Sequence, residues 1–277
     1  MPTTNAITAD KLVRLIATPR SPAIIDIRGP SDFDAIPRLI PGSVRRSLAQ
    51  LEHWSGGVPV LVVCSDGRAA SQGAAAWLRQ AGTPAEVLDG GMAAWVAAGQ
   101  PTIDAAALPP LDAADRTLWV TRARPKVDRI ACPWLIRRFV DPQAQFLFVS
   151  APDVVEVAER MAATPFDIQA EGLRWTHKGE RCTFDAMIDG FGLAGFAPLE
   201  RLATIVRGAD TNRLDFAPEA AGLLAISLGL SRAYADDLEQ LEAGLLVYDA
   251  LYRWSRDATG ETHDWASHTP STKRVPA

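Results

Sequence analysis

The sequence has little of several features that would place it in a specialised class of protein. Only three of its 277 residues are cysteines, and an odd count without a close pair argues against a framework of structural disulfides. No run of about eighteen apolar residues is present, so no membrane-spanning helix is expected. The formal net charge of −5 gives no basic surplus, which makes a nucleic-acid partner unexpected. The first residues lack the basic and apolar parts of a signal peptide, and we therefore expect a cytoplasmic protein.

What is present is the composition of a folded protein with two domains. Hydrophobic residues make up 48% of the chain and charged residues 22%, which is typical of globular proteins rather than disordered chains. The length is enough for two domains, each with its own core. Residues 104–115 contain prolines and alanines without a helix or strand period, and are predicted to form a linker. We expect domains at 1–103 and 116–257, and a flexible tail at 258–277.

The first half alternates short apolar runs with helical stretches. Val60–Val63 is an apolar, mostly β-branched run that stops at Cys64, and residues 23–27 and 85–88 are similar runs. Strands that alternate with helices predict an α/β fold, in which a parallel sheet is covered by helices on both faces. Ligands of such sheets bind at the carboxyl ends of the strands, which is where the Cys64 loop is expected.

The loop that begins at Cys64 offers an activated thiol. The helix predicted to follow it has free backbone N–H groups at its start, and these can point at the sulfur. The positive end of the helix dipole and the charge of Arg68 favour the thiolate, which is the nucleophilic form of cysteine. Ser65 and Ser71 add hydroxyl donors, whereas the Asp66 carboxylate repels an anionic substrate. The alternative is an inactive binding module that retains its cysteine.

Segments around this loop resemble the rhodanese family, sulfurtransferases that hold a persulfide on one cysteine. They follow the family's order over about residues 5–102, and are Asp26-Ile27-Arg28, Ile40-Pro41-Gly42-Ser43, the Cys64 loop, and Leu88-Asp89-Gly90-Gly91-Met92-Ala93-Ala94-Trp95. The resemblance implies that Cys64 is catalytic and that substrate is bound by Ser65, Asp66, Gly67, Arg68, Ala69 and Ser71. It also implies a small sulfur-containing anion as donor, a thiol as acceptor, and no required cofactor. Hydrogen bonds from Asp26, Arg28 and Asp89 are expected to support the neighbouring loops.

The second half is predicted to be a mostly helical α+β domain. Residues 117–121 and 145–149 are apolar runs typical of strands. Pro133 is placed in the first turn of a helix that ends at Phe139, because a proline deeper in a helix removes a hydrogen bond. Helical periodicity covers much of the remaining chain, at 152–161, 198–208, 218–228 and 232–256.

Long segments of this half resemble the C-terminal domain of the chromate resistance protein ChrB family. The resemblance covers about residues 116–256, and includes 119–129, 132–139, 205–211, 223–231 and the pairs Phe166-Asp167 and Phe184-Asp185. It implies a role in chromate resistance, with chromate as a ligand to consider. Together the two resemblances predict a sulfurtransferase that carries a persulfide on Cys64, coupled to a ChrB-like domain. The alternatives are a chromate-responsive sensor with a redox-sensitive Cys64, or a metal-dependent oxidoreductase in the second domain.

Several residues of the second half are of the types that bind metals. His177 and Glu180 are separated by two residues, and Asp128 or Asp210 could join them from elsewhere in the fold. Such a set of nitrogen and oxygen ligands suits a Zn, Mn or Fe ion. The alternative is that Gly179 forms a turn in which Glu180 faces water.

Basic residues gather near the start of the second half, at Arg122, Arg124, Lys126, Arg129, Arg137 and Arg138. Arginine pairs well with a tetrahedral oxyanion such as chromate or sulfate, and Arg122, Arg124 and Arg129 are the anion-binding candidates. The same residues would equally suit salt bridges to acidic helices, or the phosphates of a nucleic acid.

Overall fold

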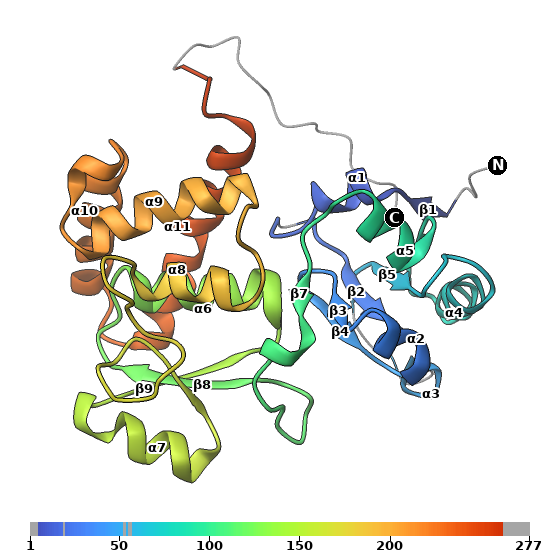
Figure 1. Cartoon of the computed structure of the whole chain (residues 1–277), viewed down its shortest axis with the longest axis horizontal. Helices are drawn as coiled ribbons and strands as arrows, with labels where there is room; N and C mark the ends of the chain where they lie inside the picture. The colour runs from blue at the N-terminus through green and yellow to red at the C-terminus, as the bar shows by residue number, and fades with distance from the viewer. Residues whose placement is uncertain (1–4, 19, 52–53, 55–56, 263–277) are drawn as a thin grey trace.

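Two parallel sheets organise the chain, one in each half (Figure 1). The structure is a computed structural model and describes residues 5–18, 20–51, 54 and 57–262. Residues 263–277 of the predicted tail lie outside the described residues. Among the described helices, none combines the length and the apolar character needed to cross a membrane.

The first half contains a five-stranded parallel sheet in the order β1-β6-β5-β2-β4. Its strands are β1 (Ala6–Ile7), β6 (Ala85–Leu88), β5 (Val60–Val63), β2 (Ala23–Asp26) and β4 (Ser43–Arg45). In the register of the central strands, Val62 lies beside Ile25 on one side and Val87 on the other. All four residues of β5 are buried, because helices cover both faces of the sheet. The predicted α/β fold is confirmed.

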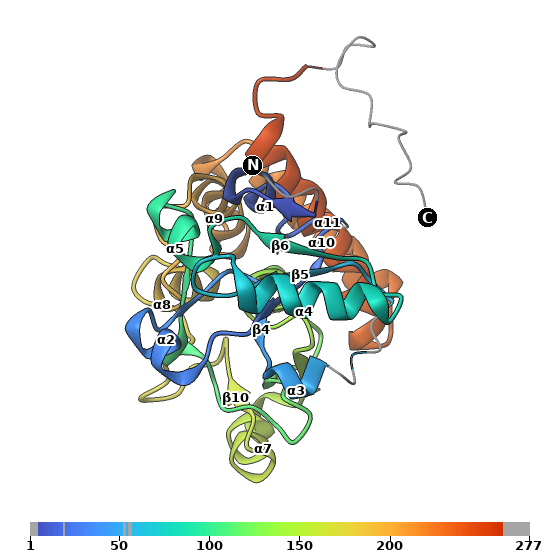
Figure 2. The ribbon, with the colours of Figure 1, turned by 90° about the vertical axis from the view of Figure 1, so that its right-hand side faces the viewer.

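The helices of this half form a layer on each face of the sheet. They are α1 (Ala9–Val13), α2 (Pro30–Ala35), α3 (Leu48–Leu51), α4 (Ala69–Gln80) and α5 (Gly91–Ala97). On one face Val62 and Cys64 share a hydrophobic core with Leu78 of α4, and Figure 2 shows α4 lying across the sheet. On the other face Leu61 shares a core with Trp95 of α5 and with the second half of the chain.

The second half contains a three-stranded parallel sheet in the order β10-β8-β9. The strands are β10 (Thr164–Pro165), β8 (Leu118–Arg122) and β9 (Gln145–Val149), and the helices are α6 (Asp128–Leu135), α7 (Val154–Met161), α8 (Thr183–Gly190), α9 (Ala197–Asp210), α10 (Ala220–Ala233) and α11 (Asp237–Asp257). Helix α7 lies on one side of the sheet, and α6 and α8 lie on the other (Figure 1). The mostly helical α+β architecture is confirmed.

Pro133 lies deeper in its helix than predicted. Helix α6 begins at Asp128, so the proline stands in the second turn, and a π-helical turn (Ile136–Val140) follows. The start of α6 is set by Val127, which has a φ of +38° and whose backbone N–H and C=O are both bonded to side chains of later helices. These tertiary hydrogen bonds outweigh the local preference of proline for a first turn.

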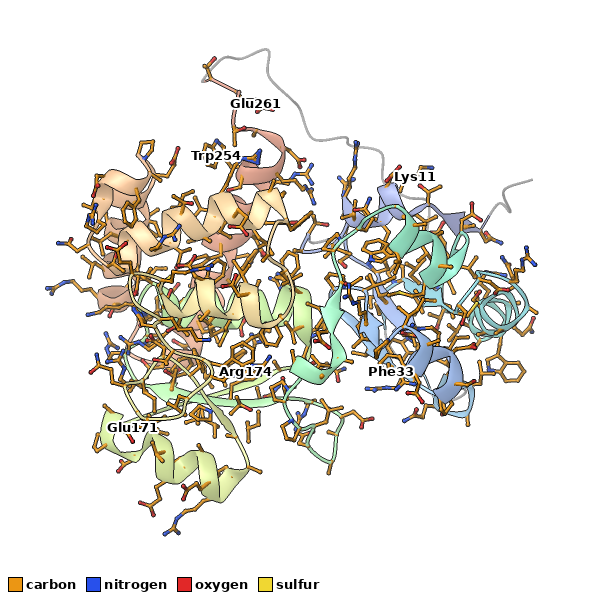
Figure 3. All side chains as sticks on the ribbon, in the orientation of Figure 1. Lys11, Phe33, Glu171, Arg174, Trp254 and Glu261 are labelled. Carbon is orange, nitrogen blue, oxygen red and sulfur yellow. The ribbon has the colours of Figure 1, made fainter. Side chains whose placement is uncertain are left out.

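The two halves pack against each other beside the segment predicted as a linker. Strand β7 (Ile103–Asp104) lies where this segment begins, pairs with β3 (Arg38–Leu39) and runs along the junction in Figure 1. Across the junction Gly42 N donates to Phe139 O at 2.6 Å. Arg174, labelled in Figure 3, donates to the carbonyl groups of Ala107 in the segment predicted as a linker and of Gly190 in α8. A continuous hydrophobic core links the halves.

Candidate functional site

The first candidate site is the loop at the carboxyl end of β5. Cys64 directly follows Val63, the last residue of that strand, and its side chain is buried beneath α4. The Cys64 Sγ lies 3.1 Å from Ser71 Oγ, in the first turn of α4, and 3.5 Å from Asp66 Oδ1. The sulfur therefore contacts one neutral hydroxyl and one carboxylate.

Two glycines hold this loop against the turn that follows β6. Both have left-handed backbone conformations, with φ of +70° at Gly67 and +58° at Gly91. A Cβ on Gly91 would lie 2.4 Å from Cys64 O, and a Cβ on Gly67 would lie 2.5 Å from Leu88 O. The backbone N–H of Met92 donates to Cys64 O at 2.9 Å. Only glycine allows backbones to approach so closely, and this approach fixes the position of the sulfur.

The other predicted substrate-binding residues of the loop point in different directions. Ser65 Oγ donates to Asp32 Oδ2 at 2.8 Å. Ala69 is exposed at the start of α4, and Arg68, the residue before it, has a side chain that is 84% exposed. The Arg68 backbone N–H donates to Asp66 Oδ1 at 3.0 Å, and its Nε lies 4.0 Å from Asp66 Oδ2. Arg68 thus pairs with Asp66, whereas the sequence predicts that its charge acts on the sulfur.

The residues predicted to support the loops lie close to the same edge of the sheet. Asp26 and Arg28 form a buried ion pair, with 2.6 Å between Oδ2 and Nη2. The Arg28 guanidinium also donates to the carbonyl groups of Ile36 and Arg38, and so ties β2 to the start of β3. Asp89 has an exposed side chain, and its backbone N–H donates to a carbonyl of β1. These contacts organise the backbone around the loop.

The second candidate site is a pocket at the carboxyl edge of the second sheet. Arg122 ends β8, Ala151 and Pro152 follow β9, and Asp167 follows β10, and all four line the pocket. The rest of the wall comes from the first turn of α7, the residues after Asp167, the region of the α6 start, the end of α9 and the loop before α8. The pocket has a volume of about 870 Å³. This edge is where ligands of open parallel sheets bind.

Three of the predicted metal ligands come together at this pocket: His177 and Asp210 line it, and Asp128 is fully buried beside them. One ligand atom each of Asp128, His177 and Asp210 lie within 4.8 Å of one another. The His177 Nε2 lies 3.2 Å from Asp210 Oδ2 and 3.5 Å from Asp128 Oδ2. Asp167 Oδ1 also lies 3.5 Å from this nitrogen. Asp167 is not among the predicted ligands, and its only signal in the sequence is its place in the Phe166-Asp167 pair. We refer to Asp128, Asp167, His177 and Asp210 as the acidic cluster.

The side chains of the acidic cluster shift one another's titration. Burial raises the pKa of Asp128, and the charges of Asp210 and Asp167 reinforce this shift. Hydrogen bonds to Asp167 and Asp210 raise the pKa of His177 to about 10. Burial acts against the Asp167 carboxylate, but hydrogen bonds from His177 and Thr183 and two nearby arginines outweigh it and hold the pKa of Asp167 below its usual value. Without a metal, the His177 imidazolium partly neutralises the carboxylates.

Asp128 has one carboxylate oxygen bonded and the other free. Its Oδ2 accepts hydrogen bonds from the backbone N–H groups of Thr183, at 2.6 Å, and Phe184, at 3.3 Å. These are the first residues of α8, so Asp128 joins the starts of two helices. Its Oδ1 is buried and has no hydrogen-bond partner among the described residues. An unsatisfied buried oxygen is costly, and a bound cation would satisfy it.

Two predicted site residues lie elsewhere. Glu180 is exposed and does not belong to the group of candidate ligands, because the chain turns at Gly179, which has a φ of +62°. Arg124 does not line the pocket within the described part of the chain. Its guanidinium instead donates to the carbonyl groups of Ser231 and Tyr234, where α10 leads into α11. Arg124 is thus used to fix a helix connection.

Apart from Arg124, the basic residues divide into two groups. Arg137 pairs with Glu242, and Arg138 pairs with Asp249 at 2.8 Å, so both bind α11 as salt bridges. The pocket is lined by the other group, Arg122, Lys126 and Arg129.

Individual proteins match parts of this chain. Over 134 residues it is 36% identical to Protein ChrB of Cupriavidus metallidurans, a match that covers 48% of this chain and 39% of that protein. The chain therefore matches less than half the length of this relative. A rhodanese-related protein from Thermoplasma volcanium is 22% identical over 36% of this chain and 97% of its own, with a TM-score of 0.30. A thiosulfate sulfurtransferase from Pseudomonas aeruginosa is 28% identical over 37% of this chain and 20% of its own, with a TM-score of 0.31.

Two regions match family models, and they correspond to the two sheets. Residues 8–98 match the Rhodanese-like domain, and this region contains β2 to β6 and the Cys64 loop. Residues 119–255 match the family described as ChrB, C-terminal domain, and this region contains the pocket with the acidic cluster. The chain therefore consists of an N-terminal rhodanese-like domain followed by a ChrB C-terminal domain.

Proposed function

We propose that the rhodanese-like domain is a sulfurtransferase that carries a persulfide on Cys64. The observation that carries the proposal is the position of Cys64 at the carboxyl end of β5, with its Sγ 3.1 Å from the Ser71 hydroxyl. A hydroxyl at this distance can donate to a thiolate or to a persulfide sulfur. Cys132 and Cys182 are poor alternatives, because both are fully buried and burial raises the pKa of both thiols.

The proposed reaction has two steps and needs no cofactor. In the first step the Cys64 thiolate attacks the outer sulfur of a donor such as thiosulfate. A sulfur–sulfur bond forms on Cys64, the sulfur–sulfur bond of thiosulfate breaks, and sulfite leaves with the electron pair. In the second step an acceptor such as cyanide or a thiolate attacks the outer sulfur, and the Cys64 thiolate is released. Since the second half is a ChrB C-terminal domain, we place this activity in chromate resistance.

Steady-state turnover of thiosulfate and cyanide tests this proposal. The parent chain should show the parallel double-reciprocal plots of a two-step mechanism. Cys64→Ser should abolish turnover, whereas Cys132→Ala should retain it, because Cys132 is a core residue. Turnover that survives Cys64→Ser would overturn the assignment of the persulfide to Cys64.

The acidic cluster supports a second candidate function, a metal centre in the ChrB C-terminal domain. The observation that favours it is the unpartnered Asp128 Oδ1, buried beside the imidazole of His177 and the carboxylate of Asp210. One nitrogen and several carboxylate oxygens suit Mn, Fe or Zn in the divalent state. A metal centre would admit metal-dependent redox chemistry in this domain, in addition to sulfur transfer.

Metal analysis of variants tests the metal centre. After loading with Mn²⁺ and desalting, the parent should retain metal and His177→Ala should lose it. Glu180→Gln is the matched control, because Glu180 is close in sequence but exposed and outside the acidic cluster. Equal metal content in the parent and in His177→Ala would remove this function.

A further inference from the structure

The pocket that contains the acidic cluster also carries three cationic side chains. Arg122, Lys126 and Arg129 line it together with Asp167, His177 and Asp210. The two arginines come from the end of β8 and the first turn of α6, and Lys126 lies in the loop between these elements. Anionic and cationic side chains therefore share one cavity of about 870 Å³ at the carboxyl edge of the sheet.

The two arginines converge on a single oxygen atom. Arg122 Nη2 lies 3.1 Å from Asp167 Oδ2, and Arg129 Nε lies 3.3 Å from the same oxygen. Two guanidinium groups offer ten N–H donors, far more than one oxygen can accept. Arg129 Nη1 already donates to the carbonyl groups of Arg122 and Ala123, but the Arg122 side chain is 42% exposed and Lys126 is exposed at the rim. Donors therefore remain available for a further anion.

The arginines also repel each other. Both guanidinium groups lie against the same Asp167 carboxylate oxygen, so their like charges are close together. Asp167 lies between them, and it is shared with His177. An anion placed against both arginines would reduce this repulsion, and their planar forks suit the oxygens of a tetrahedral oxyanion.

The balance of charge indicates when such an anion would bind. Without a metal, the three cationic side chains and the His177 imidazolium exceed the carboxylates of Asp128, Asp167 and Asp210 by one positive charge. A divalent metal held by the acidic cluster, with His177 as a neutral ligand, would leave a surplus of two positive charges. We infer that this pocket binds a small tetrahedral dianion of the sulfate class beside the metal, and that the metal controls the affinity for the anion. This inference rests on the proposed metal centre.

Calorimetric titration of the full chain tests the inference, with sulfate as the anion and Mn²⁺ as the metal. Saturating Mn²⁺ should tighten sulfate binding by about tenfold or more, and saturating sulfate should tighten Mn²⁺ binding by the same factor, because coupling between two sites is reciprocal. Sulfate bound at the Cys64 loop instead would not respond to Mn²⁺. Nitrate, a planar monoanion, should show a much smaller response.

Variants separate the anion site from the metal site. Arg122→Gln and Lys126→Gln should keep Mn²⁺ binding but lose most of the coupling, and Lys126 is exposed, so its replacement is compatible with folding. Arg160→Gln removes an exposed arginine of α7 outside the pocket and should behave like the parent. Tight Mn²⁺ binding with a sulfate affinity that ignores the metal would overturn the inference and leave the metal centre intact. A parent that binds no Mn²⁺ would overturn both.

Discussion

At the scale of single residues, Asp66 is the side chain that most opposes sulfur transfer. Its Oδ1 lies 3.5 Å from the Cys64 Sγ, and its carboxylate is more than half exposed at the mouth of the loop. A dianionic donor must approach this carboxylate to reach the sulfur. The partial pairing with Arg68, at 4.0 Å, weakens the repulsion without removing it.

Asp66→Asn should therefore speed the first step. Charges about 4 Å apart in water interact by roughly 1 kcal/mol, so kcat/KM for thiosulfate should rise by roughly threefold to tenfold. The gain should shrink as ionic strength rises, because exposed charges are screened. Kinetics at low and high salt check this, and a fall in kcat/KM at low salt would contradict it.

At the scale of elements, the contact between the Cys64 loop and the turn after β6 positions the sulfur. Gly91→Ala would place a methyl group 2.4 Å from Cys64 O at a backbone φ of +58°. The expected loss in free energy of unfolding is roughly 2–4 kcal/mol, from strain and from displaced backbone. Urea unfolding measures it. Gly73→Ala is the control, because Gly73 lies in α4 with open space around it and alanine should stabilise that helix by about 0.5–1 kcal/mol.

The start of α6 is the corresponding positioning element of the acidic cluster. Val127 is held at its unfavourable φ of +38° by Ser227 Oγ, which accepts from its N–H, and by Tyr248, whose hydroxyl donates to its carbonyl at 2.9 Å. The next residue is Asp128, so these two hydrogen bonds to Val127 help to direct the Asp128 carboxylate towards the cluster.

Tyr248→Phe should remove the hydrogen bond from the Tyr248 hydroxyl to the Val127 carbonyl. The Val127 carbonyl would keep two donors, the backbone N–H groups of Ile130 and Ala131, so the loss of one hydrogen bond should cost about 0.5–1.5 kcal/mol in free energy of unfolding. Mn²⁺ affinity should fall with it, because Asp128 is less firmly placed. Tyr252→Phe is a matched control on the same helix, since the Tyr252 hydroxyl has no hydrogen-bond partner among the described residues. Equal losses of Mn²⁺ affinity in the two variants would contradict the positioning role of Val127.

Helices and strands that show a clear apolar run or a helical period within their own residues could be predicted from the sequence. The buried runs of β2 and β5 and the periodic pattern of α4 need only a few consecutive residues to specify them. The two-residue strands β1, β7 and β10 cannot be predicted in this way, because their pairing partners are distant in the sequence. Helix α11 begins at Asp237, several residues later than its apolar pattern predicts, because the Asp236 side chain caps it.

The acidic cluster could be predicted only in part, because its residues are distant from one another in the sequence. Their residue types alone indicate His177, Asp128 and Asp210. Asp167 reaches the cluster because it follows the short strand β10, which cannot be predicted from the sequence. Glu180 lies outside the cluster because a spacing of three residues brings side chains together on a helix, and this segment is a turn. Which basic residues line the pocket and which bind helices depends on where α10 and α11 pack. Local sequence patterns do not specify that packing.

At the scale of the whole molecule, the two domains share a hydrophobic core and carry their candidate sites at the carboxyl edges of separate parallel sheets. We expect them to unfold together. Mn²⁺ at about one hundred times its Kd should add about 2.7 kcal/mol to the free energy of unfolding, and should raise the midpoint for both domains although its ligands lie in one. Thermal unfolding followed by calorimetry checks this, with Asp210→Asn as the variant that should not respond. Two separate transitions, with only one shifted by Mn²⁺, would contradict a shared core.

The intact mass of the chain after exposure to thiosulfate shows whether Cys64 carries a sulfur atom. The parent should gain the mass of one sulfur atom and lose it again when cyanide is added. Cys64→Ser should gain nothing, while Cys132→Ala should gain one sulfur atom like the parent. A parent whose mass does not change, or a Cys64→Ser variant that gains as much sulfur as the parent, would contradict the assignment of the persulfide to Cys64.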